Sequence, residues 1–173
     1  MTAKQNITMI DFTNYKNIKT LIFDVDGVLT DGTLIISEGG HLQRKMNVKD
    51  GYAMKKAMQA GFQIVIITGG NSQGVYKRLR GLGITDIYMN AQHKIEAFEE
   101  LLFVYELQKE NILYMGDDMP DFEVMQQVGL PVCPQDAIPE IRQVSKYISP
   151  YKGGEACVRD VIELVLKAHG MWA

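Results

Sequence analysis

Two aspartates separated by a single residue stand at the end of a short apolar run, in the segment Leu21–Thr30, which reads LIFDVDGVLT. Such a run predicts a strand that is buried on both faces. Because side chains two apart on an extended chain point the same way, Asp24 and Asp26 are expected to share one spot. Two like charges held together need a cation or a shared proton. The pair indicates a magnesium site or an acid–base pair, unless Asp-x-Asp-Gly is a plain turn.

Two later apolar runs also end in polar residues. Thr68 and Gly69 follow one of them, and Asp117, Asp118 and Asp121 follow the other. In open α/β sheets, ligands bind at the carboxyl ends of the strands. Polar loops are common, which would explain any one of these groups, but three such strand ends together predict a functional site.

The residue types in these groups suit phosphoryl transfer, which needs donors around the phosphate oxygens and a cation to balance their charge. The Thr68 hydroxyl and the Gly69 N–H are candidate donors. Lys94 stands where a predicted helix begins, so its ammonium and the helix N-terminus are expected to act together on an anion. Taken alone, Lys94 also fits a solvated surface lysine.

Magnesium prefers hard oxygen ligands and takes one or two carboxylates. Asp24 and Asp117 are the best candidate pair. Asp118 and Asp121 are expected to orient Lys94 and bound waters without binding the metal themselves.

Strand-like and helix-like segments alternate along the chain, which predicts a mostly parallel sheet covered on both faces. Strands are expected at 18–23, 62–67, 87–89, 112–115, 130–133 and 147–148, and helices at 52–60, 72–82, 94–107, 122–128, 138–144 and from the glycines at 153–154 to 167. Short β-prone runs around Ser37–Gly40 predict a protruding hairpin at about 33–48, closed by Lys49–Gly51. Residues 1–17 are expected to be a lead-in, and 18–173 one domain.

The composition of the 173 residues is that of an ordinary globular protein. The net charge of −3 offers no broad basic surface for nucleic acid. Two cysteines, Cys133 and Cys157, lie far apart and are typical of a reducing compartment. No apolar run is long enough to span a bilayer, and residues 1–16 lack the apolar core of a signal peptide. We therefore expect a cytoplasmic protein without membrane or nucleic-acid partners.

The combined motifs resemble the four-motif pattern of the haloacid dehalogenase superfamily. These motifs are Asp24-Val25-Asp26-Gly27-Val28, Ile67-Thr68-Gly69, Lys94 and Gly116-Asp117-Asp118-x-x-Asp121. The resemblance implies a doubly wound, Rossmann-like core and a Mg²⁺-dependent phosphatase. It also implies that Asp24 is the nucleophile and forms an aspartyl-phosphate. Asp26 would protonate the leaving alkoxide, activate water, and give the Mg²⁺ its backbone carbonyl.

The intervals where members of this superfamily insert a cap domain are short here. Asp31 to Gly61 has room for a hairpin and a helix, and Gly70 to His93 for a helix and a strand. We therefore expect a core without a cap. Such an enzyme acts on a large substrate or is covered by a neighbouring subunit.

Nearly everything after Ile18 resembles the 3-deoxy-D-manno-octulosonate 8-phosphate (Kdo 8-phosphate) phosphatases. The resemblance rests on segments 25–32, 47–51, 82–84 and 116–118 and on Gly153-Gly154 with Arg159. It implies a sugar-acid phosphate as substrate, a role in lipopolysaccharide synthesis, and a homotetramer whose hairpins meet at the centre. The last residues, 168–173, are candidates for a lid over a neighbour's site.

Two positions depart from that family. Gly70 stands where the family often has arginine and where nonulosonate 9-phosphate phosphatases often have glutamate, and Glu155-Ala156-Cys157 replaces a common second glycine step. Both departures leave the sugar open. Arg78 is the leading candidate for binding a substrate carboxylate. Lys49, Arg44 and Lys45 are further candidates, although each of these three also fits a solvated face.

Four other functions are alternatives to a Kdo 8-phosphate phosphatase. A nonulosonate 9-phosphate would need the same chemistry. A non-catalytic tetramerisation module of a sugar-nucleotide enzyme would need no catalytic aspartates. A receiver domain would place its phospho-acceptor and acidic pair on different strands, and a polynucleotide or protein phosphatase fits the acidic balance poorly.

Overall fold

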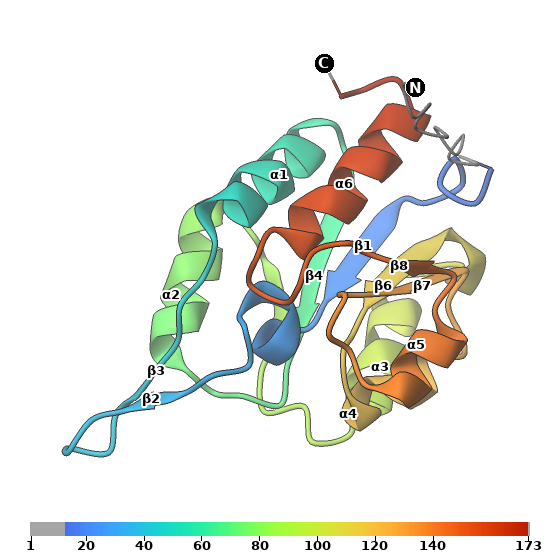
Figure 1. Cartoon of the computed structure of the whole chain (residues 1–173). Helices are drawn as coiled ribbons and strands as arrows, with labels where there is room; N and C mark the ends of the chain where they lie inside the picture. The colour runs from blue at the N-terminus through green and yellow to red at the C-terminus, as the bar shows by residue number, and fades with distance from the viewer. Residues whose placement is uncertain (1–12, 173) are drawn as a thin grey trace, which may run out of the picture.

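Six parallel strands form the central sheet of this computed structural model, in the order β5-β4-β1-β6-β7-β8 (Figure 1). The structure describes residues 13–172. The strands are β1 (Thr20–Phe23), β4 (Gln63–Ile67), β5 (Asp86–Tyr88), β6 (Ile112–Met115), β7 (Leu130–Cys133) and β8 (Tyr147–Ile148). This order confirms the predicted doubly wound, mostly parallel sheet.

Helices cover both faces of the sheet. One face carries α1 (Val48–Gln59), α2 (Gln73–Leu82) and α6 (Cys157–Ala168), and the other carries α3 (Lys94–Tyr105), α4 (Met119–Met125) and α5 (Pro139–Val144). The chain between β1 and α1 holds a short helical turn (Val25–Leu29) and a hairpin, and between β4 and α3 it holds α2 and β5, as expected for a core without a cap. Within residues 13–172, no helix is long and apolar enough to cross a membrane.

The central strand β1 sets where the polar strand ends meet. Phe23 pairs with Ile66 of β4 on one side and with Met115 of β6 on the other. The three strands therefore end nearly level, so the residues that follow them lie at one edge of the sheet. The chain winds outward from β1 to β5 and then returns to β6, and such a reversal is where doubly wound sheets bind ligands.

Two helices begin earlier than the sequence pattern predicted. α1 begins at Val48 rather than at residue 52, because the Asn47 side chain accepts the Lys49 N–H and caps the helix. Lys49–Gly51 therefore belong to α1 and do not close the hairpin. α4 spans 119–125 rather than 122–128, because Asp118 and Asp121 form a capping box at its start. In both places a side-chain cap sets the start of the helix, whereas the predicted start rests on the spacing of apolar residues.

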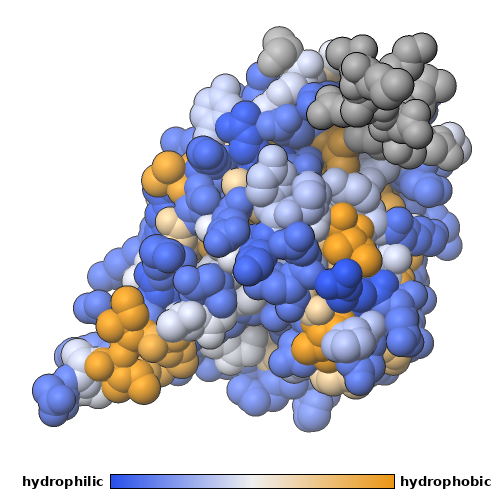
Figure 2. Space-filling view, in the orientation of Figure 1, coloured by the Kyte–Doolittle hydropathy of each residue, from blue (hydrophilic) through white to orange (hydrophobic). Residues whose placement is uncertain are grey.

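The hairpin consists of two-residue strands, β2 (Ile35–Ile36) and β3 (Leu42–Gln43), and projects from the core (Figure 1). Its apolar side chains Leu34, Ile35, Ile36 and Leu42 are exposed, and Ile36 is 69% exposed. An isolated two-stranded hairpin is marginally stable in water. Figure 2 shows the resulting apolar patch on the arm that holds the hairpin.

Asp50 joins α1 to α6 inside the core. Its side chain is buried and accepts the Arg159 N–H at 2.7 Å, in the first turn of α6. The N-cap residue of α6 is Ala156, which offers no side-chain cap of its own, so Asp50 supplies the cap from a neighbouring helix. Burial raises the Asp50 pKa to about 6, although the Arg159 N–H and charge oppose the rise.

We expect Asp50 to make the protein less stable as the pH rises from about 4 to 6. In the unfolded chain an aspartate has a pKa of about 3.9, so there the proton leaves at lower pH than in the folded protein. The unfolded state then binds fewer protons in that window, and stability falls as pH rises. Relative to wild type, Asp50→Asn should gain about 2–3 kcal/mol of unfolding free energy between pH 4 and pH 7.5. Urea unfolding at one protein concentration measures this, and parallel pH curves would contradict it.

Candidate active site

Asp24 directly follows β1 and is buried at the carboxyl edge of the sheet. One carboxylate oxygen, Oδ1, accepts the Val25 N–H at 2.6 Å, and the other, Oδ2, lies 2.8 Å from the Lys94 ammonium. The carboxylate is therefore held from two sides. This fixed orientation suits a group that must meet a phosphorus atom along one line.

Lys94 begins α3 and is only 4% exposed, so the surface-lysine alternative is wrong. Its Nζ lies 2.8 Å from Asp24 Oδ2 and 2.7 Å from Asp121 Oδ1. Burial lowers the Lys94 pKa, but the charges of Asp24 and Asp121 outweigh it and raise the pKa above its ordinary value. The lysine is therefore a fixed positive charge between two carboxylates.

Asp121 is completely buried and is satisfied by four donors. Lys94 Nζ and the Tyr114 hydroxyl reach Oδ1, and the N–H groups of Asp117 and Asp118 reach Oδ2. Tyr114 was missed in the sequence because it stands inside the apolar run of β6. The one available signal was that a buried tyrosine hydroxyl needs a partner.

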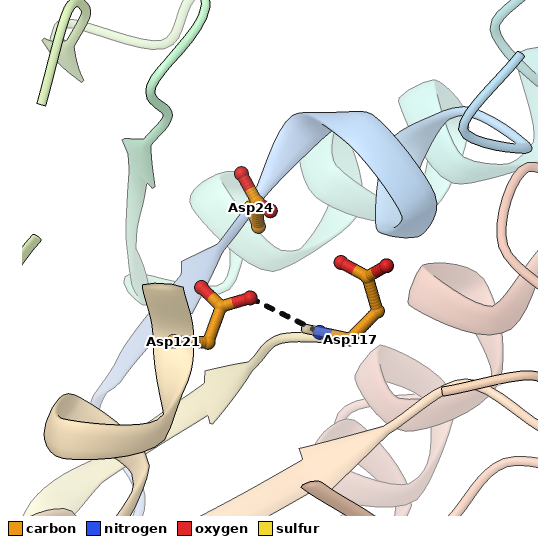
Figure 3. A group of neighbouring side chains, drawn as sticks. All are labelled: Asp24, Asp117 and Asp121. Atoms are coloured by element: carbon orange, nitrogen blue, oxygen red, sulfur yellow. Dashed lines mark hydrogen bonds between the residues drawn. The ribbon is translucent and has the colours of Figure 1, made fainter. Parts of the chain in front are cut away.

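Asp117 faces Asp24 across the end of the sheet (Figure 3). One oxygen from each of Asp24, Asp117 and Asp121 lies within 4.8 Å of the others. Burial, followed by the neighbouring carboxylates, raises the pKa of Asp24 to about 7 and that of Asp117 to about 8. Within residues 13–172, the buried Asp117 Oδ1 has no hydrogen-bond partner.

These observations fit a divalent cation between Asp24 and Asp117. Hard carboxylate oxygens are the ligands that Mg²⁺ prefers, and a cation would offset the burial and the repulsion that together raise both pKa values. Asp121 already accepts hydrogen bonds on both oxygens, so it is less available as a ligand. The arrangement supports the ligand pair that the sequence suggested.

Asp26 does not face Lys94 as Asp24 does. Its carboxylate pairs with Arg44, whose Nε lies 2.6 Å from Oδ1 and whose Nη2 lies 3.0 Å from Oδ2. Asp24 and Asp26 thus have different partners and different burial, since the Asp26 side chain is 37% exposed. This separation suits two different roles for the two aspartates.

A cleft of about 400 Å³ opens above these groups. It is lined by Asp24, Asp26, Gly27, Gly32, Thr68, Gly69, Gly70, Ala91, Gln92, Lys94, Asp117, Asp118, Pro120 and Asp121. The Thr68 hydroxyl oxygen accepts the Gly70 N–H at 3.1 Å, which leaves its proton free to be donated into the cleft. Gly27 has a φ of 90°, and a Cβ there would collide with the Asp117 carboxylate.

Three predicted site residues lie differently from the rest. Asp118 lines the cleft but caps α4 through the Met119 N–H, whereas Asp121 makes the contact to Lys94. Arg78 lines an adjoining cavity of about 520 Å³ with Arg44. Lys49 lines a cavity of about 340 Å³ against α6.

Comparisons with known proteins identify the family of this chain. The family described as haloacid dehalogenase-like hydrolase matches residues 80–161. The Kdo 8-phosphate phosphatase of Escherichia coli K12 is 39% identical over 155 residues, which cover 90% of this chain and 82% of that protein.

The chain belongs to the Kdo 8-phosphate phosphatase family of haloacid dehalogenase-like hydrolases. It is therefore a phosphoric monoester hydrolase. A solved Kdo 8-phosphate phosphatase from Yersinia pestis superimposes with a TM-score of 0.90 at 37% identity, covering 92% of this chain and 86% of that one. The Moraxella catarrhalis family member was solved with magnesium, phosphate and Kdo; its TM-score is 0.88 at 34% identity, with 91% and 90% covered.

We expect Asp117→Asn to weaken Mg²⁺ binding by about tenfold or more, because a carboxylate ligand with no other partner for Oδ1 is lost. Isothermal titration calorimetry of Mg²⁺ into the purified protein measures this without turnover. Asp118→Asn is the matched control. It removes the same charge from the next residue, but the Asp118 side chain caps α4 and is not a proposed metal ligand. Equal losses in both variants would mean that the effect is general electrostatics and that Asp117 is not a ligand.

Proposed function

We propose that this phosphatase hydrolyses Kdo 8-phosphate to Kdo and inorganic phosphate. The observation that carries the proposal is the buried Asp24, held between Val25 N–H and Lys94 and facing Asp117, at the carboxyl edge of the sheet. Identity of 39% to Kdo 8-phosphate phosphatases over most of both chains supports the substrate.

In the first step, a carboxylate oxygen of Asp24 attacks the phosphorus atom. The new bond is Asp24 O–P, and the bond that breaks is the one between phosphorus and the sugar oxygen. Asp26 donates a proton to that leaving oxygen, so the sugar acid departs as an alcohol. The Lys94 ammonium stays beside Asp24 and offsets the charge that collects on the phosphoryl oxygens.

In the second step, Asp26 takes a proton from water, whose oxygen attacks the phosphorus of the aspartyl-phosphate. The Asp24 O–P bond breaks, which restores the Asp24 carboxylate and releases phosphate. The Thr68 hydroxyl and the Gly69 backbone, which line the cleft, are the proposed donors to the phosphoryl oxygens.

Mg²⁺ is the cofactor, since phosphatases of this class use it and the acidic cluster fits it. Asp24, Asp117 and the backbone carbonyl of Asp26 are the proposed ligands. Bound there, the ion supplies positive charge next to the transferring phosphoryl group.

The substrate carboxylate is expected to meet cations beside the cleft. Arg78 stays the leading candidate, because its cavity adjoins the site through Arg44, which lies against both. Lys49 is a weaker candidate, because its cavity is formed with α6 and is not linked to the catalytic cleft by a contact such as that of Arg44 with Asp26.

We further propose a homo-oligomer, a tetramer, assembled through the hairpins. The exposed apolar residues of β2 and β3 and their unpaired edges invite pairing with other copies. The cleft is open on one side in a single chain, and a neighbour would enclose a small sugar phosphate.

The proposed lid at the end of the chain also depends on assembly with other copies. Trp172 packs edge-on against Tyr52 and lies beside Lys56 and Arg159 of its own chain. The chain end lies away from the edge of the sheet where its own cleft opens (Figure 1). The tail would therefore cover a site only in another copy, and this stays a prediction.

We expect purified protein with Mg²⁺ to release phosphate from Kdo 8-phosphate faster than from nonulosonate 9-phosphates or hexose phosphates. A phosphate-release assay with all three classes side by side measures kcat/KM. Asp24→Asn, which keeps the size of the side chain but not the nucleophile, should lose more than about 1000-fold. Preference for a nonulosonate 9-phosphate would overturn the substrate, and an active Asp24→Asn variant would overturn the mechanism.

We expect Ile36→Ser to shift the protein from tetramer toward smaller species, because it removes the most exposed apolar contact of the hairpin. Light scattering measures the mass. Phe103→Ser is the matched control, since Phe103 is 86% exposed but lies on α3 outside the hairpin. A wild-type monomer that is fully active would contradict assembly through the hairpin.

A further inference from the structure

Arg44 reaches from the hairpin into the edge of the active site. It lies just after β3, yet its side chain is only 8% exposed. Its guanidinium grips both oxygens of Asp26, with Nε at 2.6 Å and Nη2 at 3.0 Å. Within residues 13–172, the hydrogen bonds to the Asp26 carboxylate come from this one side chain.

The chain segment that carries Arg44 explains why the side chain points inward. It is extended, so alternate side chains face opposite ways. Arg44 and Met46 face the protein, where Met46 packs against the core, while Lys45 is 78% exposed. The Asn47 side chain then donates to the Gly154 carbonyl. The segment is thus held at Met46 and at Asn47, and its backbone directs the Arg44 side chain toward Asp26.

Gly70 leaves the space that the ion pair occupies. A Cβ at Gly70 would lie 3.4 Å from Asp26 Oδ2 and 3.5 Å from Arg44 Nη2. A longer side chain there would meet the pair directly. Gly70, which has no side chain, therefore leaves room for the Arg44 side chain of the hairpin segment beside Asp26.

We propose that Arg44 is a positioning residue that fixes the orientation of Asp26 for proton transfer to the leaving group. The planar guanidinium makes two parallel bonds, which set the plane of the carboxylate as well as its place. Asp26 is otherwise 37% exposed on a turn and would rotate between solvent and the cleft. The inference rests on the proposed role of Asp26 as general acid and base.

A positioning role is distinguishable from a purely structural one. Because the Asp26 side chain is 37% exposed, water replaces the guanidinium at its carboxylate when Arg44 is removed. Arg44→Gln keeps part of the buried side chain, so the fold is expected to persist. The effect should instead appear in the step where Asp26 delivers a proton. That step matters most for a poor leaving group, because a good one needs little protonation.

The test is a series of aryl and alkyl phosphates of graded leaving-group acidity, assayed with Mg²⁺ and the full chain. Arg44→Gln should lower kcat/KM by about 10–100-fold for the poorest leaving group, since misplacement by about 1 Å costs up to about 100-fold, and far less for the best one. Arg44→Lys should recover only part of the loss, because an ammonium cannot make two parallel bonds. Lys77→Gln, which removes a positive charge from an exposed position of α2, is the control and should leave the series unchanged.

Asp26→Asn, run in the same series, separates the two possible failures. The kcat/KM loss of Asp26→Asn could depend on the leaving group while that of Arg44→Gln is equal on all substrates. The positioning role would then be wrong and the proposed function would stand. A loss confined to KM for substrates that carry a carboxylate would make Arg44 a substrate-binding residue and also overturn the inference. If Asp26→Asn itself shows no dependence, the acid role of Asp26 fails, and the Arg44 inference fails with it.

Discussion

The ion pair of Lys94 with Asp24 and Asp121 is the interaction on which this site depends. Three carboxylates at one sheet edge repel one another, and burial adds to the cost of their charges. A buried lysine between two of them, a tyrosine hydroxyl and two backbone N–H groups offset that cost. Asp117 keeps one buried oxygen without a partner among the described residues, which leaves it free for a metal ion.

Close packing of loops brings these groups to one place. Gly27 approaches the Asp117 carboxylate, and Gly153 approaches the backbone at Gly27 and Thr30, so closely that a Cβ at either glycine would collide. The Gly154 N–H also donates to the Val28 carbonyl. The loop before α6 thus braces the turn after β1. Ala156 in this loop has a φ of 76°, a conformation that favours glycine.

The hairpin connects assembly to chemistry. Its exposed apolar side chains offer a surface to other copies, and its returning segment carries the arginine that binds Asp26. A hairpin of two-residue strands has little stability of its own. Contacts at its ends, through Met46 in the core and Asn47 on Gly154, therefore determine where Arg44 lies.

The sequence by itself determined the alternation of strands and helices and the residues that end β1, β4 and β6, because apolar runs and the polar residues after them are local features. It also identified Lys94, but not its burial. The sequence also predicted that Asp118 and Asp121 orient this lysine. The tertiary structure alone decided that Asp121 rather than Asp118 binds it, that Tyr114 supports Asp121, and that Arg44 binds Asp26, since each contact joins residues 7 to 27 positions apart. The starts of α1 and α4 were set by side-chain caps that hydrophobic spacing does not register. Arg78 lines a cavity with residues of the hairpin segment, and Lys49 lines a different cavity with residues of α6. No local sequence pattern encodes which elements form these cavities.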